Sequence, residues 1–249
     1  MRKQYKHAPI SEVVLGVGYR QPKIWVDLVL KNAMLCEEFP SVEIGPPLTI
    51  EILEGFGVVA AQNQLGGPFL VRRRTADNKW LVQIQANMLY LNWIRQDTDP
   101  VGNYVGFDAV KERFFSVLSK LENSLGISLR EDIIFCELSY IDRFPWECEV
   151  QELSELNKLV RISTPPKFSE HGYNNVFSRF TFHDFEIQGF GLVNVNTTTA
   201  ISGEQMVIAE ANLRGNPAGE LDGWLERAHA KQHVIFEGLF TDEMRKRWE

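Results

Sequence analysis

The sequence predicts an α+β fold in which long helices pack on one face of an antiparallel sheet. Segments with alternating apolar residues recur along the 249-residue chain and are separated by Gly, Pro, Asn and Asp. Two long amphipathic segments, 107–125 and 221–240, each follow a run of such strands. Both halves therefore contain a strand, a helix, several strands and a closing helix. We expect one domain over residues 1–249, pseudo-duplicated as 1–126 and 127–249.

The first half begins with a strand over residues 10–19, in which apolar side chains alternate with others. Helical spacing predicts a helix over 25–39, which Pro40 ends. The clearest helix, 107–125, stops at Gly126, which suits the left-handed position after a helix end. Further strands are expected at 48–53, 69–75 and 80–86, the last continuing through 89–94, with turns at 66–68 and 76–78.

The second half begins with a long strand over residues 133–144 and continues with a short helix around 153–160. The final helical segment spans 221–248 and restarts at Thr241, a residue type that caps helix N-termini. Its apolar stripe is expected to lie on the sheet. Three strands are expected between the two helical segments, at 176–185, 186–198 and 206–213.

Composition restricts the class of protein and of partner. The formal charge of −7 and the pI of about 5.4 disfavour nucleic acid, because a phosphate-binding surface needs clustered Lys and Arg. The three cysteines have no paired spacing, which suits a reducing compartment and indicates neither a disulfide framework nor a zinc site. No stretch approaches the roughly 18–20 apolar residues that span a bilayer. We expect a soluble cytoplasmic protein with no cofactor and no membrane partner.

The final helix carries the residues that most resemble a metal site. His229 and His233 are four residues apart and Glu237 extends the line by a turn, so all three could face one ion. Ala230 stands where a metalloprotease helix has its catalytic glutamate. His229 also lies at the edge of the apolar stripe. The spacing therefore favours a buried histidine that makes one hydrogen bond, with a ligand-binding role as the alternative.

Arginines and aromatic residues of three strands are candidates for binding a partner or a ligand. In the segment FLVRRRT, alternation places Arg72 and Arg74 on one face and Arg73 on the core side, where it needs a carboxylate partner. In ELSYIDRF, Tyr140 shares a face with Asp142. Core packing or a solvated strand face explains these patterns equally well. The candidate residues are Arg72, Arg73, Arg74, Trp93, Arg95, Tyr140, Arg143 and His229.

Other motifs fall short of a catalytic signature. Gly16 and Gly18 lie inside a strand without the third glycine of a dinucleotide loop, and indicate a bulge or a place where a helix packs closely. His183 and Asp184 are adjacent in a strand, so their side chains point to opposite faces unless a turn intervenes. No serine or cysteine has the sequence context of a nucleophile elbow. Catalytic residues are therefore not assigned.

Four passages in this order resemble a sporadically distributed family of bacterial conserved hypothetical proteins of about this length, to which no activity is assigned. They are HAPISEVVLGVGY, QIQANMLYLNWIR, YVGFDAVKERFF with ELSYIDRF, and LERAHAKQHVIFEGLFTDEMRKRW. The resemblance spans nearly the whole chain. It implies a patchy, horizontally transferred distribution that is typical of defence, toxin–antitoxin or other accessory loci, and it supplies no catalytic residues.

The expected layout is comparable to the helix-grip and TATA-box-binding-protein-like arrangements, which use a concave sheet or a helix–sheet cavity for binding, although fold alone does not fix function. The leading prediction is a non-enzymatic recognition or assembly subunit that binds a protein partner, or a second copy of itself, in an accessory bacterial system. The alternative is a small-molecule binder or hydrolase with a cavity between the sheet and the C-terminal helix, lined by Arg73, Tyr140 and His229. Nucleic-acid binding through Arg72, Arg74 and Arg95 is the least favoured prediction.

Overall fold

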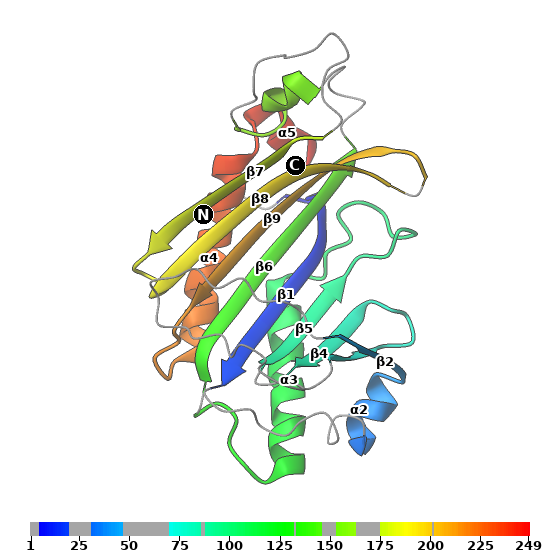
Figure 1. Ribbon diagram of the computed structural model, residues 1–249, viewed down its shortest axis with the longest axis vertical. Coiled ribbons are helices and arrows are strands. Elements are labelled where there is room, and N and C mark those ends of the chain that lie inside the picture. The colour runs from blue at the N-terminus through cyan, green and yellow to red at the C-terminus, as the bar shows by residue number, and fades with distance from the viewer. Residues whose placement is uncertain are drawn as a thin grey trace.

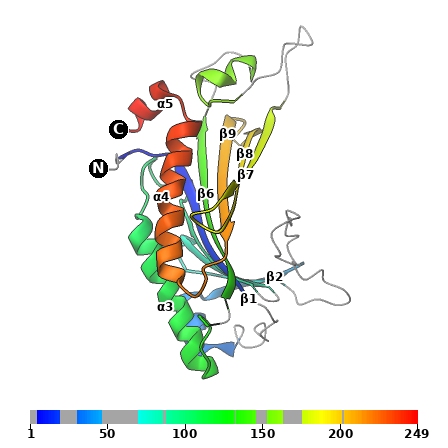
Figure 2. The same ribbon diagram turned by 90° about the vertical axis from the view of Figure 1, so that its left-hand side faces the viewer.

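The chain folds as α+β, with one large antiparallel sheet and long helices on one of its faces (Figures 1 and 2). The computed structural model describes residues 5–19, 31–46, 70–85, 88–131, 133–145, 153–162, 175–200 and 202–249. The strands are β1 (Ile10–Tyr19), β2 (Ser41–Gly45), β3 (Leu70–Arg74), β4 (Trp80–Gln85), β5 (Met88–Ile94), β6 (Ile133–Pro145), β7 (Phe177–Asp184), β8 (Gly189–Thr199) and β9 (Gln205–Gly215). The helices are α2 (Ala33–Glu38), α3 (Phe107–Leu125), the 3-10 helix η1 (Leu153–Lys158), α4 (Leu221–Leu239) and α5 (Asp242–Arg247).

Across the described residues the sheet has the strand order β2-β3-β4-β5-β1-β6-β9-β8-β7, and every neighbouring pair is antiparallel. The strands β1 and β6 lie side by side in the middle, with Val13 opposite Tyr140 and Leu15 opposite Leu138. On its other edge, each of these two strands pairs with the strand that precedes a long helix: β1 with β5, and β6 with β9.

One strand prediction is wrong. Residues 80–94 were expected to form one continuous strand, but β4 and β5 are two strands that pair with each other in the antiparallel sense. Gln85 lies opposite Met88, so the chain reverses direction between them. The expected strand at 48–53, the turn at 66–68 and the helix residues 25–30 lie outside the described residues. No helix in the described ranges combines the length and the apolar character that a bilayer crossing requires.

The central strand β1 presents two different faces because successive side chains point to opposite sides. Val13, Leu15 and Val17 are fully buried in the main core, on the face that the helices cover. On the other face, Gly16 lies directly opposite Tyr90 of β5, and Gly18 directly opposite Phe135 of β6. The glycines thus make room for aromatic rings of neighbouring strands and not for a helix, which was one of the two expectations. The other expectation, a bulge, agrees with the shift in the pairing of β1 with β6 between Gly18 and Tyr19.

The α3 helix buries the stripe that its sequence predicts, and α4 buries the first half of its stripe, since Ile235, Phe236 and Leu239 are only partly buried. α3 buries Phe107, Val110, Phe114, Val117, Leu118 and Leu121, and Gly126 ends it in the left-handed conformation. α4 buries Leu221, Trp224, Leu225, Ala228 and Gln232. The Trp224 indole donates a hydrogen bond of 2.8 Å to the Ile187 carbonyl, which fixes the start of α4 against the turn before β8. The main hydrophobic core is built from both long helices and the central strands.

A second core lies at the other end of α4. The rings of Phe236, Phe240 and Trp248 pack on one another with centroid separations of 4.8 to 5.5 Å. Thr241 caps α5 as the sequence predicts, since its hydroxyl oxygen accepts from the Met244 amide at 3.4 Å. The His7 amide donates to the Trp248 carbonyl at 2.9 Å, so the segment before β1 is held beside α5.

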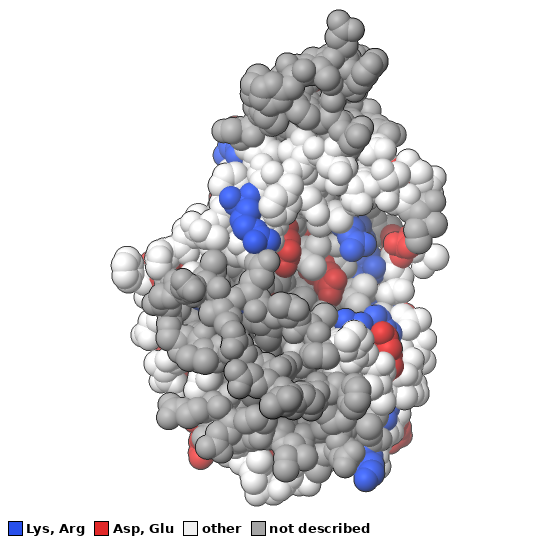
Figure 3. Space-filling view, in the orientation of Figure 1, with Lys and Arg blue, Asp and Glu red and all other residues white. Residues whose placement is uncertain are grey.

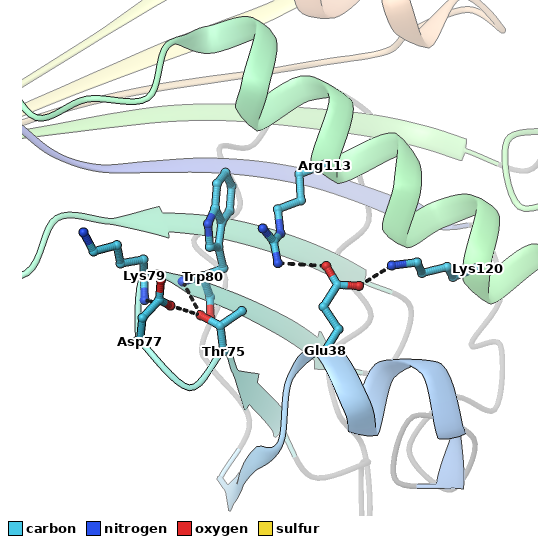
Figure 4. Close-up of polar contacts among 7 residues, drawn as sticks. All are labelled: Glu38, Thr75, Asp77, Lys79, Trp80, Arg113 and Lys120. Carbon is cyan, nitrogen blue, oxygen red and sulfur yellow. Dashed lines mark hydrogen bonds and ion pairs between the residues drawn. The ribbon is translucent and has the colours of Figure 1, made fainter.

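Ion pairs attach α2 to α3 beneath the β3–β4 hairpin (Figure 4). The Glu38 carboxylate accepts from Arg113 at 2.8 Å and is also paired with Lys120. The Arg113 guanidinium lies 4.6 Å from the centre of the Trp80 ring, a cation–π contact. In the predicted turn at 76–78, the Asp77 carboxylate accepts from the Thr75 hydroxyl at 2.6 Å, which confirms this hairpin.

His183 and Asp184 lie at the end of β7, next to the turn that leads into β8. The Asp184 carboxylate accepts from the backbone amides of Glu186 and Ile187 and forms a salt bridge of 2.9 Å with Lys231 of α4. His183 is exposed on the opposite face of the strand. As the alternation predicts, the two side chains do not form an acid–base pair.

Candidate functional site

A cavity of about 380 Å³ lies between the sheet and α4. Its walls come from the segment before β1, the loop that leads into α3, the strands β6 and β9, and the second half of α4. The lining residues are Tyr5, Lys6, Ala8, Ile10, Gly102, Tyr104, Gly106, Phe107, Tyr140, Asp142, Ala209, Ala211, His229, Gln232, His233, Ile235, Phe236, Leu239 and Phe240. The two alanines of β9 are small, which leaves space between that strand and the helix.

A chain of hydrogen bonds crosses the wall of the cavity. The hydroxyls of Tyr104 and Tyr140 are 3.0 Å apart, and the Tyr140 hydroxyl is 3.1 Å from Nδ1 of His229. The His229 ring stacks on Phe107 with a centroid separation of 4.0 Å and an interplanar angle of 6°. Four elements of the fold therefore hold this group: the loop before α3, α3 itself, β6 and α4.

Burial controls the protonation of the two tyrosines. Desolvation raises the pKa of Tyr140 well above its ordinary value, and it raises the pKa of Tyr104 as well. Both hydroxyls therefore keep their protons at neutral pH and act as neutral hydrogen-bonding groups. A neutral phenol can both donate and accept a hydrogen bond.

Asp142 is the second polar feature of the cavity. It lies two residues after Tyr140 on the same face of β6, and it is 6% exposed. Its Oδ1 atom is buried without a hydrogen-bond partner among the residues that the structure describes. Burial raises the pKa of Asp142 to about 7, although attraction to the Arg95 guanidinium opposes the shift. Burial of a carboxyl oxygen without a hydrogen bond costs free energy.

The rest of the wall is mainly apolar and aromatic. The rings of Phe236 in α4, of Phe240 directly after that helix, and of Tyr5 enclose the end of the cavity nearest the second core. The Tyr5 and Phe236 ring centroids are 5.1 Å apart. Gln232 closes the floor, because its side-chain amide donates to the Leu138 and Ala211 carbonyls at 3.0 and 2.8 Å. A few convergent polar groups in an aromatic wall are typical of small-molecule sites.

The structure brings together two of the three residues expected at a helix–sheet cavity. Tyr140 and His229 are in contact there, whereas Arg73 is not among the described residues that line it. Arg73 is buried, as alternation predicts, and its Nη1 donates to the Phe39 carbonyl at 2.9 Å. This contact joins β3 to the backbone carbonyl that follows α2.

The remaining strand candidates lie in different places. Trp93 is 1% exposed and packs edge-on against Tyr104 at 5.1 Å, so it supports the cavity wall from behind. Arg95 is half-buried, its amide donates to the Ser11 carbonyl, and its charge acts on Asp142. Arg143 is exposed on β6, on the opposite side of that strand from Tyr140.

Arg72 belongs to a polar network on the face of the sheet that the helices leave open. Its Nε donates to Gln83, the Gln83 amide donates to Asn92, and Asn92 donates to Glu12. Elsewhere on this face Glu137 pairs with Arg214 at 2.8 Å. On the part of this face that the structure describes, acidic and basic side chains therefore lie next to one another (Figure 3), whereas nucleic-acid binding needs clustered Lys and Arg.

The two histidines of α4 do not complete a metal site in this structure. The rings of His229 and His233 are 6.0 Å apart and meet edge-on. Within the described ranges, no group of three or more His, Cys, Asp or Glu side chains is placed to hold an ion. His229 makes the expected hydrogen bond, to Tyr140, but it is half-buried and not fully buried as the favoured expectation had it. It also lines the cavity, as the alternative requires.

Sequence reasoning missed Tyr104 and the importance of Asp142. Tyr104 lies in a loop, where no periodicity marks it. Asp142 did carry a signal, because Leu138, Tyr140 and Phe144 mark the core-facing side of β6 and a charged residue on that side is exceptional.

No family model matches the chain, and a search of curated proteins finds no significant match.

Proposed function

We propose that this protein binds a small organic molecule in the cavity between the sheet and α4. The observation that carries the proposal is the cavity itself: its volume of about 380 Å³ falls within the range of ligand sites, roughly 300 to 1,000 Å³. The Tyr104, Tyr140 and His229 group would fix the orientation of the ligand, and the aromatic wall would bury its apolar part.

The test is to fill the cavity and measure ligand binding. Ala211 lines the cavity from β9, so Ala211→Leu places three extra carbon atoms in it. A library of small metabolites is screened by thermal shift and native mass spectrometry against the unmodified chain. Ala109→Leu, at an exposed position of α3, is the matched control. We expect Ala211→Leu alone to abolish binding of the molecules that the screen identifies.

Two outcomes would count against the proposal. The first is a library in which nothing binds the unmodified chain. The second is a ligand that binds Ala211→Leu and Ala109→Leu with equal affinity, since such a ligand would have to bind outside the cavity. The same cavity could also hydrolyse the molecule that it binds. If it does, replacement of His229 by alanine would abolish turnover without lowering the melting temperature.

Recognition of a protein partner, or of a second copy, is our second proposal. The observation that favours it is β7, the last strand of the described sheet, where Phe177 is 61% and Phe180 is 44% exposed. Exposed aromatic residues on an edge strand are typical of surfaces that pair with another chain. Size-exclusion chromatography with light scattering, and capture with neighbouring gene products, test it; a strict monomer without a partner at micromolar concentration would exclude it.

We further propose that the two halves of the chain are related by duplication, in a helix-grip or TATA-box-binding-protein-like arrangement. The strand order supports this, because β1 and β6 are adjacent and antiparallel, and each pairs with the last strand of its own half. A long helix follows that last strand in both halves. Membership of the sporadic bacterial family, and a place in an accessory system, stay proposals on which the binding site does not depend.

A further inference from the structure

We propose that the ligand of this cavity is an organic ammonium ion, an amine attached to an apolar or aromatic body. This inference rests on the proposed binding function and names its ligand class. It starts from Asp142, whose side chain lines the cavity, is 6% exposed, and leaves Oδ1 without a hydrogen-bond partner in the described part of the chain. A ligand that supplies both a donor and a positive charge would satisfy this atom.

The hydroxyls beside Asp142 also have acceptor capacity to spare. A phenol has one proton and two lone pairs, and the Tyr140 hydroxyl already contacts both Tyr104 and His229. In the tautomer of His229 that carries its proton on Nε2, Tyr104 donates to Tyr140 and Tyr140 donates to Nδ1. The lone pairs that remain on both hydroxyls can then only accept. An ammonium group, with three donors and no acceptor, complements them and the carboxylate together.

The wall around these acceptors suits a cation with an apolar body. Among the described residues, six aromatic rings line the cavity besides His229 and His233: Tyr5, Tyr104, Phe107, Tyr140, Phe236 and Phe240. The faces of such rings attract ammonium groups and also bury hydrocarbon. A cage of aromatic rings with one carboxylate therefore recognises the two parts of an amine at once.

The neighbouring positive charges do not favour an anion instead. The Arg95 guanidinium is not among the described residues that line the cavity, although its charge reaches Asp142. Lys6 lines the cavity but is exposed, so water solvates its charge. An anionic ligand would place its charge against the carboxyl of Asp142 and the lone pairs of the tyrosines.

The experiment compares three probes of similar shape on the full chain at pH 8: 2-phenylethylamine, 2-phenylethanol and phenylacetate. Isothermal titration calorimetry measures the affinity of each. We expect the amine to bind at least tenfold more tightly than the alcohol, and the phenylacetate to bind most weakly. These measurements need no variant, so they remain informative whatever a substitution does to folding.

Asp142→Asn keeps the shape of the side chain but removes its charge. We expect it to weaken amine binding at least tenfold and to change alcohol binding less than twofold. Asp222→Asn is the matched control, because Asp222 is an exposed residue at the far end of α4 that pairs with Lys111, and it should leave all three affinities unchanged.

Equal affinities for amine and alcohol, tighter binding of phenylacetate, or no binding of any probe would each overturn the assignment of an amine. The library screen against the Ala211→Leu variant separates this failure from a failure of the binding function. If that screen identifies a cavity ligand that is neutral or anionic, the binding function stands and only the ligand class is wrong.

Discussion

At the scale of single residues, the carboxyl group of Asp142 makes the stability of the fold depend on pH. Its pKa rises from 3.8 to about 7 on folding, chiefly because burial disfavours the charged form. Between these two values the folded chain holds a proton that the unfolded chain has released. The free energy of unfolding therefore falls as pH rises from about 4 to 7, by at most about 4 kcal/mol from this group.

We expect Asp142→Asn to remove this part of the pH dependence, so that the variant is more stable than the unmodified chain at pH 8. Urea unfolding of both proteins at pH 5 and pH 8 measures the effect. Arg95, whose charge acts on Asp142, is present in both proteins, so the difference between the two proteins isolates the carboxyl. An identical decrease in both proteins would show that other groups control it.

The glycines of β1 lead to a second prediction about single residues. A Cβ on Gly18 would lie 1.8 Å from a ring carbon of Phe135, so the ring would have to move. We expect Gly18→Ala to destabilise the fold by about 1–3 kcal/mol, as overpacking does. Gly45→Ala, where the added carbon meets nothing within 4 Å, is the control for glycine replacement in a strand.

A double-mutant cycle separates overpacking from a general intolerance of the position. Phe135→Leu replaces the rigid ring with a smaller, flexible side chain, so Gly18→Ala should cost less in that background. Thermal unfolding of the four proteins gives the coupling energy. Costs that simply add would mean that the Phe135 ring is not the obstacle.

At the scale of elements, Gln232 joins α4 to the two strands beneath it. Its amide donates to carbonyl groups of both β6 and β9 from a position that is 5% exposed. Gln232→Leu keeps the approximate size of the side chain but removes the donor from both carbonyls. We expect a loss of about 2 kcal/mol in the free energy of unfolding, since buried groups left unsatisfied typically cost 1–3 kcal/mol.

Val234→Leu is the control on the same helix, because Val234 is 62% exposed and its replacement should change stability by less than about 0.5 kcal/mol. Chemical denaturation measures both variants. If Gln232→Leu unfolds at the same denaturant concentration as the unmodified chain, the two hydrogen bonds do not hold α4 on the sheet.

Most helices and strands could be predicted from the sequence, but not all of the strand pairing. The long helices and most strands follow from local periodicity and from residues such as Gly126 and Thr241 that end or begin helices. The reversal between β4 and β5 was missed because apolar residues continue on both sides of it without a strong turn signal. Pairing between strands, which no local pattern encodes, decides such a case.

The candidate site was predictable only in part, for a related reason. Alternation along β6 places Tyr140 and Asp142 on one face, and that expectation is met where both line the cavity. Their contacts with Tyr104 and His229 connect a strand to a loop and to a helix that lies 89 residues further along the chain. Such contacts depend on the packing of α4 over β6, which is decided by the whole core.

At the scale of the whole molecule, the main core is shared between the two halves. Leu15 of β1, Phe114 of α3 and Trp224 of α4 all belong to it. We therefore expect residues 1–126 and 127–249, produced separately, to remain unfolded, and to form a folded complex when they are produced together. Circular dichroism and size-exclusion chromatography test this. Cooperative unfolding of either half alone would show that it is an independent domain.

The position of β1 in the middle of the sheet also has a consequence for biosynthesis. β1 is complete once Tyr19 has been made, but its partner β6 is complete only at Pro145. At about 5 to 20 residues per second, the 126 residues that follow Tyr19 up to and including Pro145 (145 − 19) take roughly 6 to 25 seconds to translate. During that time one edge of an apolar strand has no partner from its own chain. The nascent protein is therefore most exposed to aggregation before its second half leaves the ribosome.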